Sequence, residues 1–409
     1  MPKFYGTNGE DVIVGTSSSD LIHAYGGDDV IKAADPEPYL PAGTDTIYGG
    51  TGDDKIYVGA GSMNQIHGES GDDYIYAEYS EKGSFYGGSG DDTIILQYVD
   101  GFSAEGGSGD DVFYITTSDF RITDSSGLDT IYSEAFDLIL PTGIENGGLV
   151  GGTDGGTPPG LKAAVTGNSG NNNLSGALYS ESTLKGLGGN DTLHGKNGND
   201  FLFGGSGTDS FYGGAGSDTV DYSDHATAVA VNLATGKVTF PGKSWAPETL
   251  SSIENAATGD ASDTLVGNAG VNDLRGRGGN DWLSGGTGAD RLGGGKGFDT
   301  FVFKAGDSTT SATDVLRAVD SGKAFDNPGS AKGDLIDLRG IDAVVGGGDT
   351  AFKWGGTTKK SAGYLWLGTE GSDTVILGNT DSDSAAELKI RIADGSVSHT
   401  AYGTADFLL

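Results

Sequence analysis

The sequence predicts an all-β chain that coils into parallel rolls, and three observations point to this fold. A nine-residue pattern, Gly-Gly-x-Gly-x-Asp-x-apolar-x, recurs along the 409 residues. Its eighth position is apolar in every strong copy, and 75 glycines supply the turns. A repeat this short cannot bury an apolar face alone, so we expect successive copies to stack on one another.

The period predicts the path of the chain. Two nonapeptides make about one turn of a flattened coil, each giving a six-residue loop and a three-residue strand. Because neighbouring strand residues face opposite sides, position eight points inward and positions seven and nine point outward. The inward columns are Ile56, Ile75, Ile94 and Phe113; Leu193, Leu202, Phe211 and Val220; and Leu265, Leu274, Leu283, Leu292 and Phe301. A shift of one residue would destroy these columns, so the register is well defined.

The copies fall into three blocks. In the first, half-turns that lack the acid, with Asn64 and Gly83 in its place, separate strong copies 19 residues apart. The strong copies of the three blocks begin at Gly49, Gly68, Gly87 and Gly106; at Gly186, Gly195, Gly204 and Gly213; and at Thr258, Gly267, Gly276, Gly285 and Gly294. Weaker copies end at Asp11 and Asp29, and a Pro-rich insertion, 36–41, precedes the first strong copy.

The loops point to a cation. Glycines let the loop curl so that its carbonyl groups face a common point, and position six adds a carboxylate. Carbonyl and carboxylate oxygens are the ligands that Ca²⁺ prefers, usually six to eight of them. One turn supplies too few, so we expect successive turns to share each ion and folding to depend on its binding. Bound Ca²⁺ would also offset the net charge of −34.

These repeats resemble the RTX (repeats-in-toxin) family, whose nonapeptides form parallel β-rolls with Ca²⁺ between turns. Carried onto this chain residue by residue, the resemblance implies ligation by position-six acids and by glycine carbonyls. The implied acids are Asp11, Asp29, Asp54, Asp73, Asp92, Asp111, Asp191, Asp200, Asp209, Asp218, Asp263, Asp281, Asp290 and Asp299. The implied glycines are Gly49, Gly52, Gly68, Gly71, Gly87, Gly90, Gly106, Gly109, Gly186, Gly195, Gly204, Gly213, Gly276, Gly285 and Gly294. Asn172 and Asn272 depart from the pattern.

The blocks and the segments between them predict the domain organisation. We expect rolls at 1–118, 166–222 and 258–302, in two or three stacks. Apolar and polar residues alternate in 119–165 and 223–257, which favours hairpin insertions. Residues 147–160, rich in Gly and Pro, are the best candidate for a linker.

The nonapeptides stop near residue 302, and 303–409 reads as strands of a closing β-cap. This stretch resembles the C-terminal domain of serralysin-type secreted proteins. The last residues, 404–409, place an acid before an apolar tail and resemble a signal for type I secretion; the alternative is an ordinary cap strand. With no apolar N-terminal segment, we expect export from a Gram-negative bacterium by this route, without a signal peptide.

Composition excludes several classes of function. The acidic chain has no basic stripe for nucleic acid, no run of 18 apolar residues for a membrane, and no cysteine for disulfides or thiolate sites. No zinc-protease histidine pair, Gly-x-Ser-x-Gly motif or phosphate loop is present. We therefore expect no catalysis, although a carboxylate pair hidden among the acids would be the exception.

One outward column bears on the biological role. Position nine of the first block reads Tyr57, Tyr76, Ile95 and Tyr114, one turn apart. Simple cross-strand stacking explains such a column, and so does a strip for self-association or glycan contact. We expect a structural subunit of a surface layer, matrix or filament that calcium assembles. The alternatives are an adhesin or lectin-like protein that binds polysaccharide, and, third, an enzyme.

Overall fold

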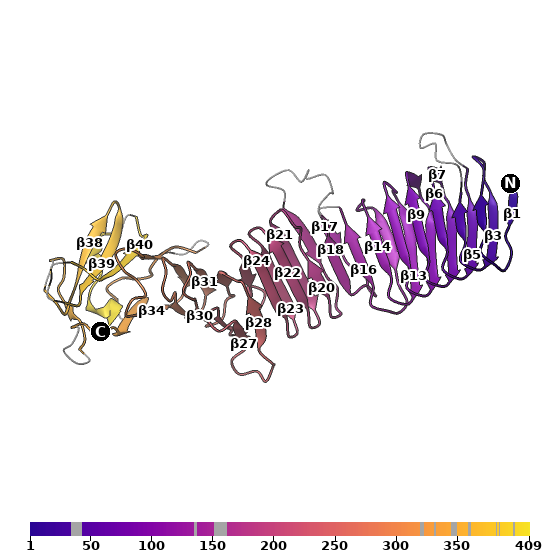
Figure 1. Ribbon diagram of the computed structural model, residues 1–409. Helices are drawn as coiled ribbons and strands as arrows, with labels where there is room; N and C mark the ends of the chain where they lie inside the picture. Colours follow the sequence, from indigo (N-terminus) through magenta and orange to yellow (C-terminus); the bar gives the residue numbers. More distant parts are fainter. Residues whose placement is uncertain are drawn as a thin grey trace. The chain divides into compact units, whose positions relative to one another are not determined.

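The computed structural model divides the chain into two compact units, Met1–Asp200 and Phe201–Leu409 (Figure 1). The boundary falls inside the second predicted block, 166–222, so that block is shared between the units. The described residues are 1–33, 43–134, 137–150, 162–319, 323–330, 333–344, 350–358, 361–381, 383, 385–395 and 397–409. The Pro-rich insertion and most of the candidate linker lie outside these ranges.

The first unit is a parallel coil in which the chain alternates between facing sheets. One sheet contains β1 Lys3–Tyr5, β3 Leu21–Gly26, β5 Thr46–Thr51, β8 Gln65–Ser70, β11 Ser84–Ser89, β13 Phe102–Ser108 and β15 Phe120–Thr123. The facing sheet contains β2 Val12–Val14, β4 Val30–Lys32, β6 Lys55–Val58, β9 Tyr74–Glu78, β12 Thr93–Gln97, β14 Val112–Ile115, β16 Thr130–Ser133, β18 Asn146–Leu149, β20 Asn173–Ser175 and β22 Thr192–Asn197. Two short strands, β7 Gly61–Ser62 and β10 Ser80–Glu81, pair beside them. All of these pairs are parallel, as a roll requires.

The core of this unit lies between the two sheets. Ile56, Ile75, Ile94 and Phe113 stand opposite one another in successive strands and are fully buried. The half-turns without an acid contribute the facing column, in which Ile66 and Phe85 are also fully buried. Strand residues alternate between the core and the outside, so the predicted register is confirmed.

The prediction of a hairpin insertion at 119–165 is wrong. Residues 120–123 and 130–133 form β15 and β16, which pair in parallel with β13 and β14 and so continue the coil. Farther along, β17 Asp137–Ile139, β19 Ala163–Thr166 and β21 Ser182–Gly188 form a third parallel sheet. Gly147 to Leu149 belong to β18 rather than to a linker. Alternation of apolar and polar residues identifies a strand but leaves the direction of its partner open.

The second unit begins as the same kind of coil. Its first sheet contains β23 Phe201–Ser206, β25 Thr219–Asp221, β29 Asn255–Ala257, β31 Asp273–Gly278, β33 Arg291–Lys296 and β35 Asp314–Leu316, all in parallel. Its second contains β24 Ser210–Ala215, β26 Ala230–Asn232, β27 Lys237–Thr239, β28 Glu248–Ser251, β30 Thr264–Val266, β32 Trp282–Ser284 and β34 Thr300–Lys304. Strand β27 is antiparallel to both β26 and β28, so a hairpin interrupts the coil within 223–257.

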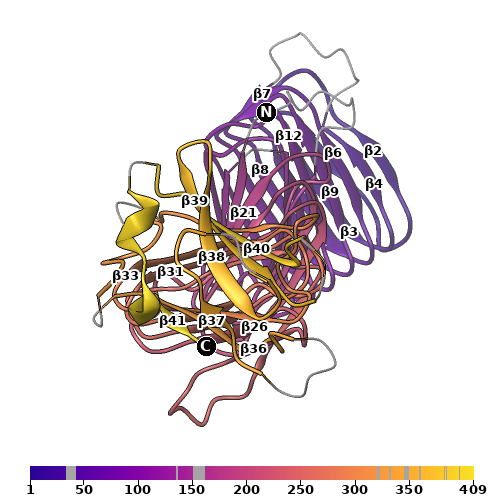
Figure 2. The same ribbon diagram turned by 90° about the vertical axis from the view of Figure 1, so that its left-hand side faces the viewer.

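The C-terminal strands close the second unit. An antiparallel sheet of β38 Tyr364–Glu370, β39 Asp373–Asn379 and β40 Leu388–Ile392 joins the coil through a parallel pair of β40 with β35 (Figure 2). Strand β36, Leu335–Gly340, extends the second sheet and pairs with the terminal strand β41, Phe407–Leu408. Short strand β37, Lys353–Trp354, and two 3₁₀ turns, η1 His399–Ala401 and η2 Thr404–Asp406, complete the cap. Within the described residues, no helix has the length and apolarity needed to span a membrane.

Candidate metal centre

The position-six carboxylates of the first unit form a ladder that links successive turns. The main-chain amide of Asp54 donates to Oδ1 of Asp73 at 2.8 Å, and that of Asp73 donates to Oδ1 of Asp92 at 2.8 Å. The amide of Asp92 continues the ladder to Asp111 at 2.7 Å. All four side chains are buried. The ladder therefore fixes each carboxylate in place and directs its second oxygen into the loop.

The second oxygen of these carboxylates lacks a partner. Among the described residues, Oδ2 of Asp54, Asp73, Asp92 and Asp111 is buried and accepts no hydrogen bond. The same holds for Asp29, Asp281, Asp290 and Asp299. A buried carboxylate oxygen without a donor is costly, and its cost is removed when a cation binds it. The donor set of the loops fits a hard cation.

The position-one glycines bring main-chain oxygens to the same point. A Cβ on Gly68 would collide with the Asp73 carboxylate and would lie 2.6 Å from the carbonyl oxygen of Gly87 in the next turn. Position four adopts a left-handed backbone, with φ of +125° at Gly71 and +122° at Gly90, which favours glycine. Each loop therefore offers a carboxylate oxygen from its own turn and a carbonyl oxygen from the next.

Burial makes these carboxylates hard to ionise without a cation. Loss of hydration raises the pKa of Asp54 to about 6, of Asp73 to about 8 and of Asp92 to about 7. In Asp73 the neighbouring charges of Asp92 and Asp54 add to the effect. A bound divalent cation reverses this balance, because it favours the charged form of every oxygen around it.

The loops of the second unit repeat the arrangement. The amide of Asp263 donates to Oδ1 of Asp281 at 2.8 Å, and that of Asp281 donates to Oδ1 of Asp299 at 2.9 Å. A Cβ on Gly276 would lie 2.8 Å from the carbonyl oxygen of Gly294. Burial raises the pKa of Asp281 to about 8. The same chemistry therefore recurs in both units.

The remaining candidate acids fall into two groups. Asp191, Asp200, Asp209 and Asp218 are buried at their loops like the ladder members above. Asp11 differs, because it is half-buried and its Oδ2 accepts from the main-chain amide of Thr7 at 2.5 Å and from the Thr7 hydroxyl at 2.8 Å. Its Oδ2 is already satisfied, unlike those of Asp54, Asp73, Asp92 and Asp111.

Where asparagine stands at position six, its side-chain amide donates a hydrogen bond in the loop, so no cation is needed to satisfy the acceptor. The Nδ2 amide of Asn272 donates to the Glu254 carbonyl at 2.7 Å, and that of Asn172 donates to the Glu145 carbonyl at 3.3 Å. On the opposite edge of the first unit, Asn64 donates to Ser80 Oγ at 3.2 Å. Where the acid is missing, neutral hydrogen bonds hold the turns together.

Several ladder members lie outside the nonapeptide copies named above. Asp129 is position six of a degenerate copy at 124–132, which keeps Gly127 at position four and Ile131 at position eight. Asp129 accepts from the amide of Asp111 at 2.8 Å, and Glu145 accepts from Asp129 at 3.1 Å. In the second unit, Glu254 accepts from Asp218, Asp314 from Asp290 and Asp334 from Asp299, each at 2.9 Å. For Glu145 and Glu254 the sequence offers one common signal, the tripeptide Ile-Glu-Asn at 144–146 and 253–255.

A profile of a known protein family agrees with this chemistry. The profile of the family described as RTX calcium-binding nonapeptide repeat (4 copies) matches residues 5–35, 42–62, 64–78, 84–96, 185–220, 257–292 and 266–301. No curated protein sequence matches the chain. Among solved structures, the extracellular lipase LipA from Serratia marcescens matches at 17% identity and a TM-score of 0.19, over 64% of this chain. The match spans 42% of the lipase chain.

The matched segments include most of the loops described above. They cover the strong copies at Gly49, Gly68, Gly186 and Gly276 together with their buried acids. The folded strands of both units form the parallel β-roll expected of such repeats. The chain therefore carries RTX calcium-binding nonapeptide repeats, and Ca²⁺ is the ion that they bind.

Proposed function

We propose that the protein is an extracellular, non-catalytic structural subunit whose folding and assembly are triggered by calcium. The observation that carries the proposal is the ladder of buried carboxylates with unpaired second oxygens. These charges repel one another inside the roll unless a cation lies between turns, so binding free energy becomes folding free energy. The position-six acids and the glycine carbonyls of the same loops are the proposed ligands.

Calcium-dependent folding suits export in an unfolded state. A chain that stays unfolded where calcium is scarce can cross an envelope and then fold outside, where calcium is abundant. We assign this route to type I secretion from a Gram-negative bacterium, with residues 303–409 as a serralysin-like secretion domain. The terminal segment, 404–409, is the proposed signal, and it packs as η2 and β41 in the folded chain.

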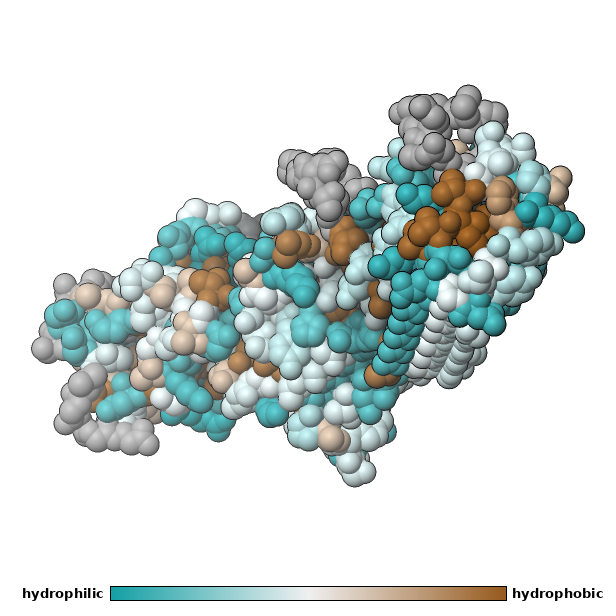
Figure 3. Space-filling view, turned by 45° about the vertical axis from the view of Figure 1, so that its right-hand side comes forward, coloured by the Kyte–Doolittle hydropathy of each residue, from teal (hydrophilic) through white to brown (hydrophobic). Residues whose placement is uncertain are grey.

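The proposed assembly surface is the outward strip Tyr57, Tyr76, Ile95 and Tyr114. These residues lie in register on β6, β9, β12 and β14, and Tyr132 extends the strip by stacking on Tyr114 at 5.0 Å. Tyr57 and Tyr114 are exposed. Figure 3 shows a separate cluster of strongly apolar residues on the surface of the first unit, to which the tyrosines do not belong because their hydropathy on that scale is weakly hydrophilic. A flat strip of rings and aliphatic side chains suits contact with a second copy of this chain.

Sedimentation and electron microscopy, with calcium and after chelation, test the proposal. We expect lattices or filaments with calcium and an unfolded monomer without it. Replacing Tyr57 and Tyr114 by serine should abolish assembly, while the calcium-dependent circular dichroism signal is retained. Tyr179, an exposed tyrosine away from the strip, provides the matched control as Tyr179→Ser. Monodisperse particles at every calcium concentration would contradict the structural role.

A second candidate function, polysaccharide binding, is favoured by one surface pocket. A hollow of about 570 Å³ is lined by Tyr98, Asp100, Thr116, Thr117, Ser118, Glu134 and Asp137. Tyr98 is exposed and stacks on Tyr79 at 5.1 Å. An exposed ring beside carboxylates and hydroxyls is a combination that suits sugar rings. Retention of the folded chain on an acidic or neutral polysaccharide column, lost in Tyr98→Ala, would favour an adhesin.

A further inference from the structure

The end of the first block differs from the turns before it. In the earlier turns, a Cβ on the position-one glycine would meet the carbonyl oxygen of the next position-one glycine. This distance is 2.7 Å from Gly49 to the Gly68 oxygen and 2.6 Å from Gly87 to the Gly106 oxygen. At Gly106 itself, Oδ1 of Asp124 lies at 2.6 Å instead. A side-chain carboxylate therefore stands where every earlier turn presents a main-chain carbonyl.

Hydrogen bonds hold Asp124 in this position. The amide of Gly107 donates to its Oδ1 at 2.6 Å, and the amide of Ser126 donates to its Oδ2 at 3.1 Å. Asp124 directly follows strand β15, which is paired with β13. The carboxylate is therefore fixed by the backbone of two successive turns.

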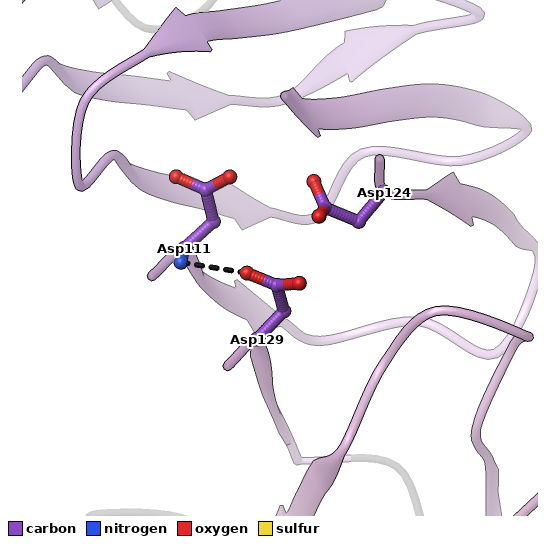
Figure 4. A group of neighbouring side chains, drawn as sticks. All are labelled: Asp111, Asp124 and Asp129. Carbon is purple, nitrogen blue, oxygen red and sulfur yellow. Dashed lines mark hydrogen bonds between the residues drawn. The ribbon is translucent and has the colours of Figure 1, made fainter. Parts of the chain in front are cut away.

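Asp124 shares one space with two ladder acids. One carboxylate oxygen from each of Asp111, Asp124 and Asp129 lies within 4.8 Å of the others (Figure 4). Asp111 and Asp129 are fully buried, and Oδ2 of Asp111 accepts no hydrogen bond from the described residues. In the part of the chain that the structure describes, no Lys, Arg or His forms an ion pair with any of the three. Three converging carboxylates with a buried unpaired oxygen therefore have no positively charged side chain among the described residues to balance them.

We propose that Asp111, Asp124 and Asp129 form a calcium site that is more highly charged than the repeat sites and fills before them. Exchange of a neutral carbonyl for a carboxylate adds one negative ligand, and calcium affinity rises with the number of charged ligands. The site joins the last strong nonapeptide of the first block to the loop between β15 and β16 in the next turn. It extends calcium binding one turn beyond the strong copies of the first block. This inference rests on the calcium-dependent folding proposed above.

The first test is a calorimetric titration of the chelator-stripped full chain with Ca²⁺, in competition with a chelator of known affinity. The variant is Asp124→Asn, which keeps an oxygen in place and removes the charge. We expect the tightest class of sites to weaken at least about tenfold. Asp119→Asn removes the same charge from an exposed position five residues away and should leave that class unchanged. An unchanged tightest class in Asp124→Asn overturns the proposal.

A second test uses the wild-type chain and needs no variant. The wild-type chain is folded and crystallised with saturating Ca²⁺, one molar equivalent of Tb³⁺ is then exchanged in, and anomalous scattering locates the site that Tb³⁺ occupies first. We expect the strongest peak between Asp111, Asp124 and Asp129; a strongest peak at a repeat loop, such as that between Asp54 and Asp73, overturns the proposal. If the wild-type chain binds no Ca²⁺ at all, it is the proposed calcium-triggered function that fails, so the two failures are distinguishable.

Discussion

The main-chain amide of Asp218 donates a hydrogen bond of 2.9 Å to Oε2 of Glu254, which lies 36 residues later in the chain. This bond spans the hairpin formed by β26 and β27 and rejoins the coil on its far side. In an unbroken block the acceptor would be the position-six acid of a neighbouring turn, as Asp281 is for Asp263. Glu254 therefore takes the place of a nonapeptide acid where the repeat is interrupted.

This relationship predicts the effect of shortening Glu254. Replacement by Ala leaves the buried amide of Asp218 without its acceptor, at a cost of about 1–3 kcal/mol of unfolding free energy. Urea unfolding of the calcium-saturated chain measures the loss. Glu254→Gln keeps an oxygen at the same reach and should lose less. Equal stability of the Ala and Gln variants would show that the bond contributes nothing.

Replacing a buried acid of the ladder should change the stability of the chain in opposite directions with and without calcium. Asp73→Asn removes a charge that burial disfavours, so we expect it to stabilise the chain when calcium is absent. It also removes a charged ligand, so it should destabilise the calcium-saturated chain by roughly 1–3 kcal/mol. Thermal unfolding with excess Ca²⁺ measures the loss. Because the calcium-free chain is unfolded in buffer, the gain is measured as a shift in the osmolyte concentration that folds the chelated chain at pH 8. A shift of the same sign in both conditions contradicts this role for Asp73.

The position-one glycines should not tolerate even a methyl group. In Gly68→Ala, the added Cβ would press on the Asp73 carboxylate and on the Gly87 carbonyl oxygen. We expect the midpoint of calcium-induced folding to move to higher calcium, measured by far-ultraviolet circular dichroism. Gly59→Ala is the matched control, because a Cβ there has nothing within 4 Å. Matching midpoints for the two variants would show that the loop relaxes around the extra atom.

The sequence predicted the parts of the site that obey the repeat and missed those that do not. Position eight is buried and position six forms the ladder because both follow from a nine-residue period. Four acceptors escaped prediction: Glu145, Glu254, Asp314 and Asp334. They lie 16, 36, 24 and 35 residues from Asp129, Asp218, Asp290 and Asp299, whose main-chain amides donate to them. Separations of 16, 24 and 35 residues are not multiples of nine, because the path of the intervening chain sets them. The separation of 36 residues is four periods, but the interval contains the hairpin of β26 and β27 in place of nonapeptide copies.

The hairpin expected at 119–165 failed for a related reason. Hairpins and coil strands share the alternation of apolar and polar residues. Strand β16 is parallel to β14 because Ile131 packs beneath Phe113 and extends the buried column of the roll. That choice depends on a core already built by earlier turns, which local patterning does not contain.

The raised pKa values predict how pH acts on the calcium-free chain. Asp73 and Asp92 titrate in the unfolded chain near 3.8, but burial raises their pKa to about 8 and about 7 in the folded chain. Between these values the folded state holds more protons than the unfolded state, so its stability falls as pH rises from about 4 to about 8. Acidification should therefore restore β structure to chelated protein, whereas at pH 8 only calcium does so.

Circular dichroism of the chelated chain at pH 8, 6.5 and 5 measures this recovery. Repeating the series in 1 M salt separates the buried acids from the general repulsion of a chain with a net charge of −34, because salt screens exposed charges far more than buried ones. Recovery at pH 5 that persists in high salt assigns the effect to the ladder. A β signal equally strong at pH 8 and pH 5 would mean that the buried carboxylates are compensated without calcium.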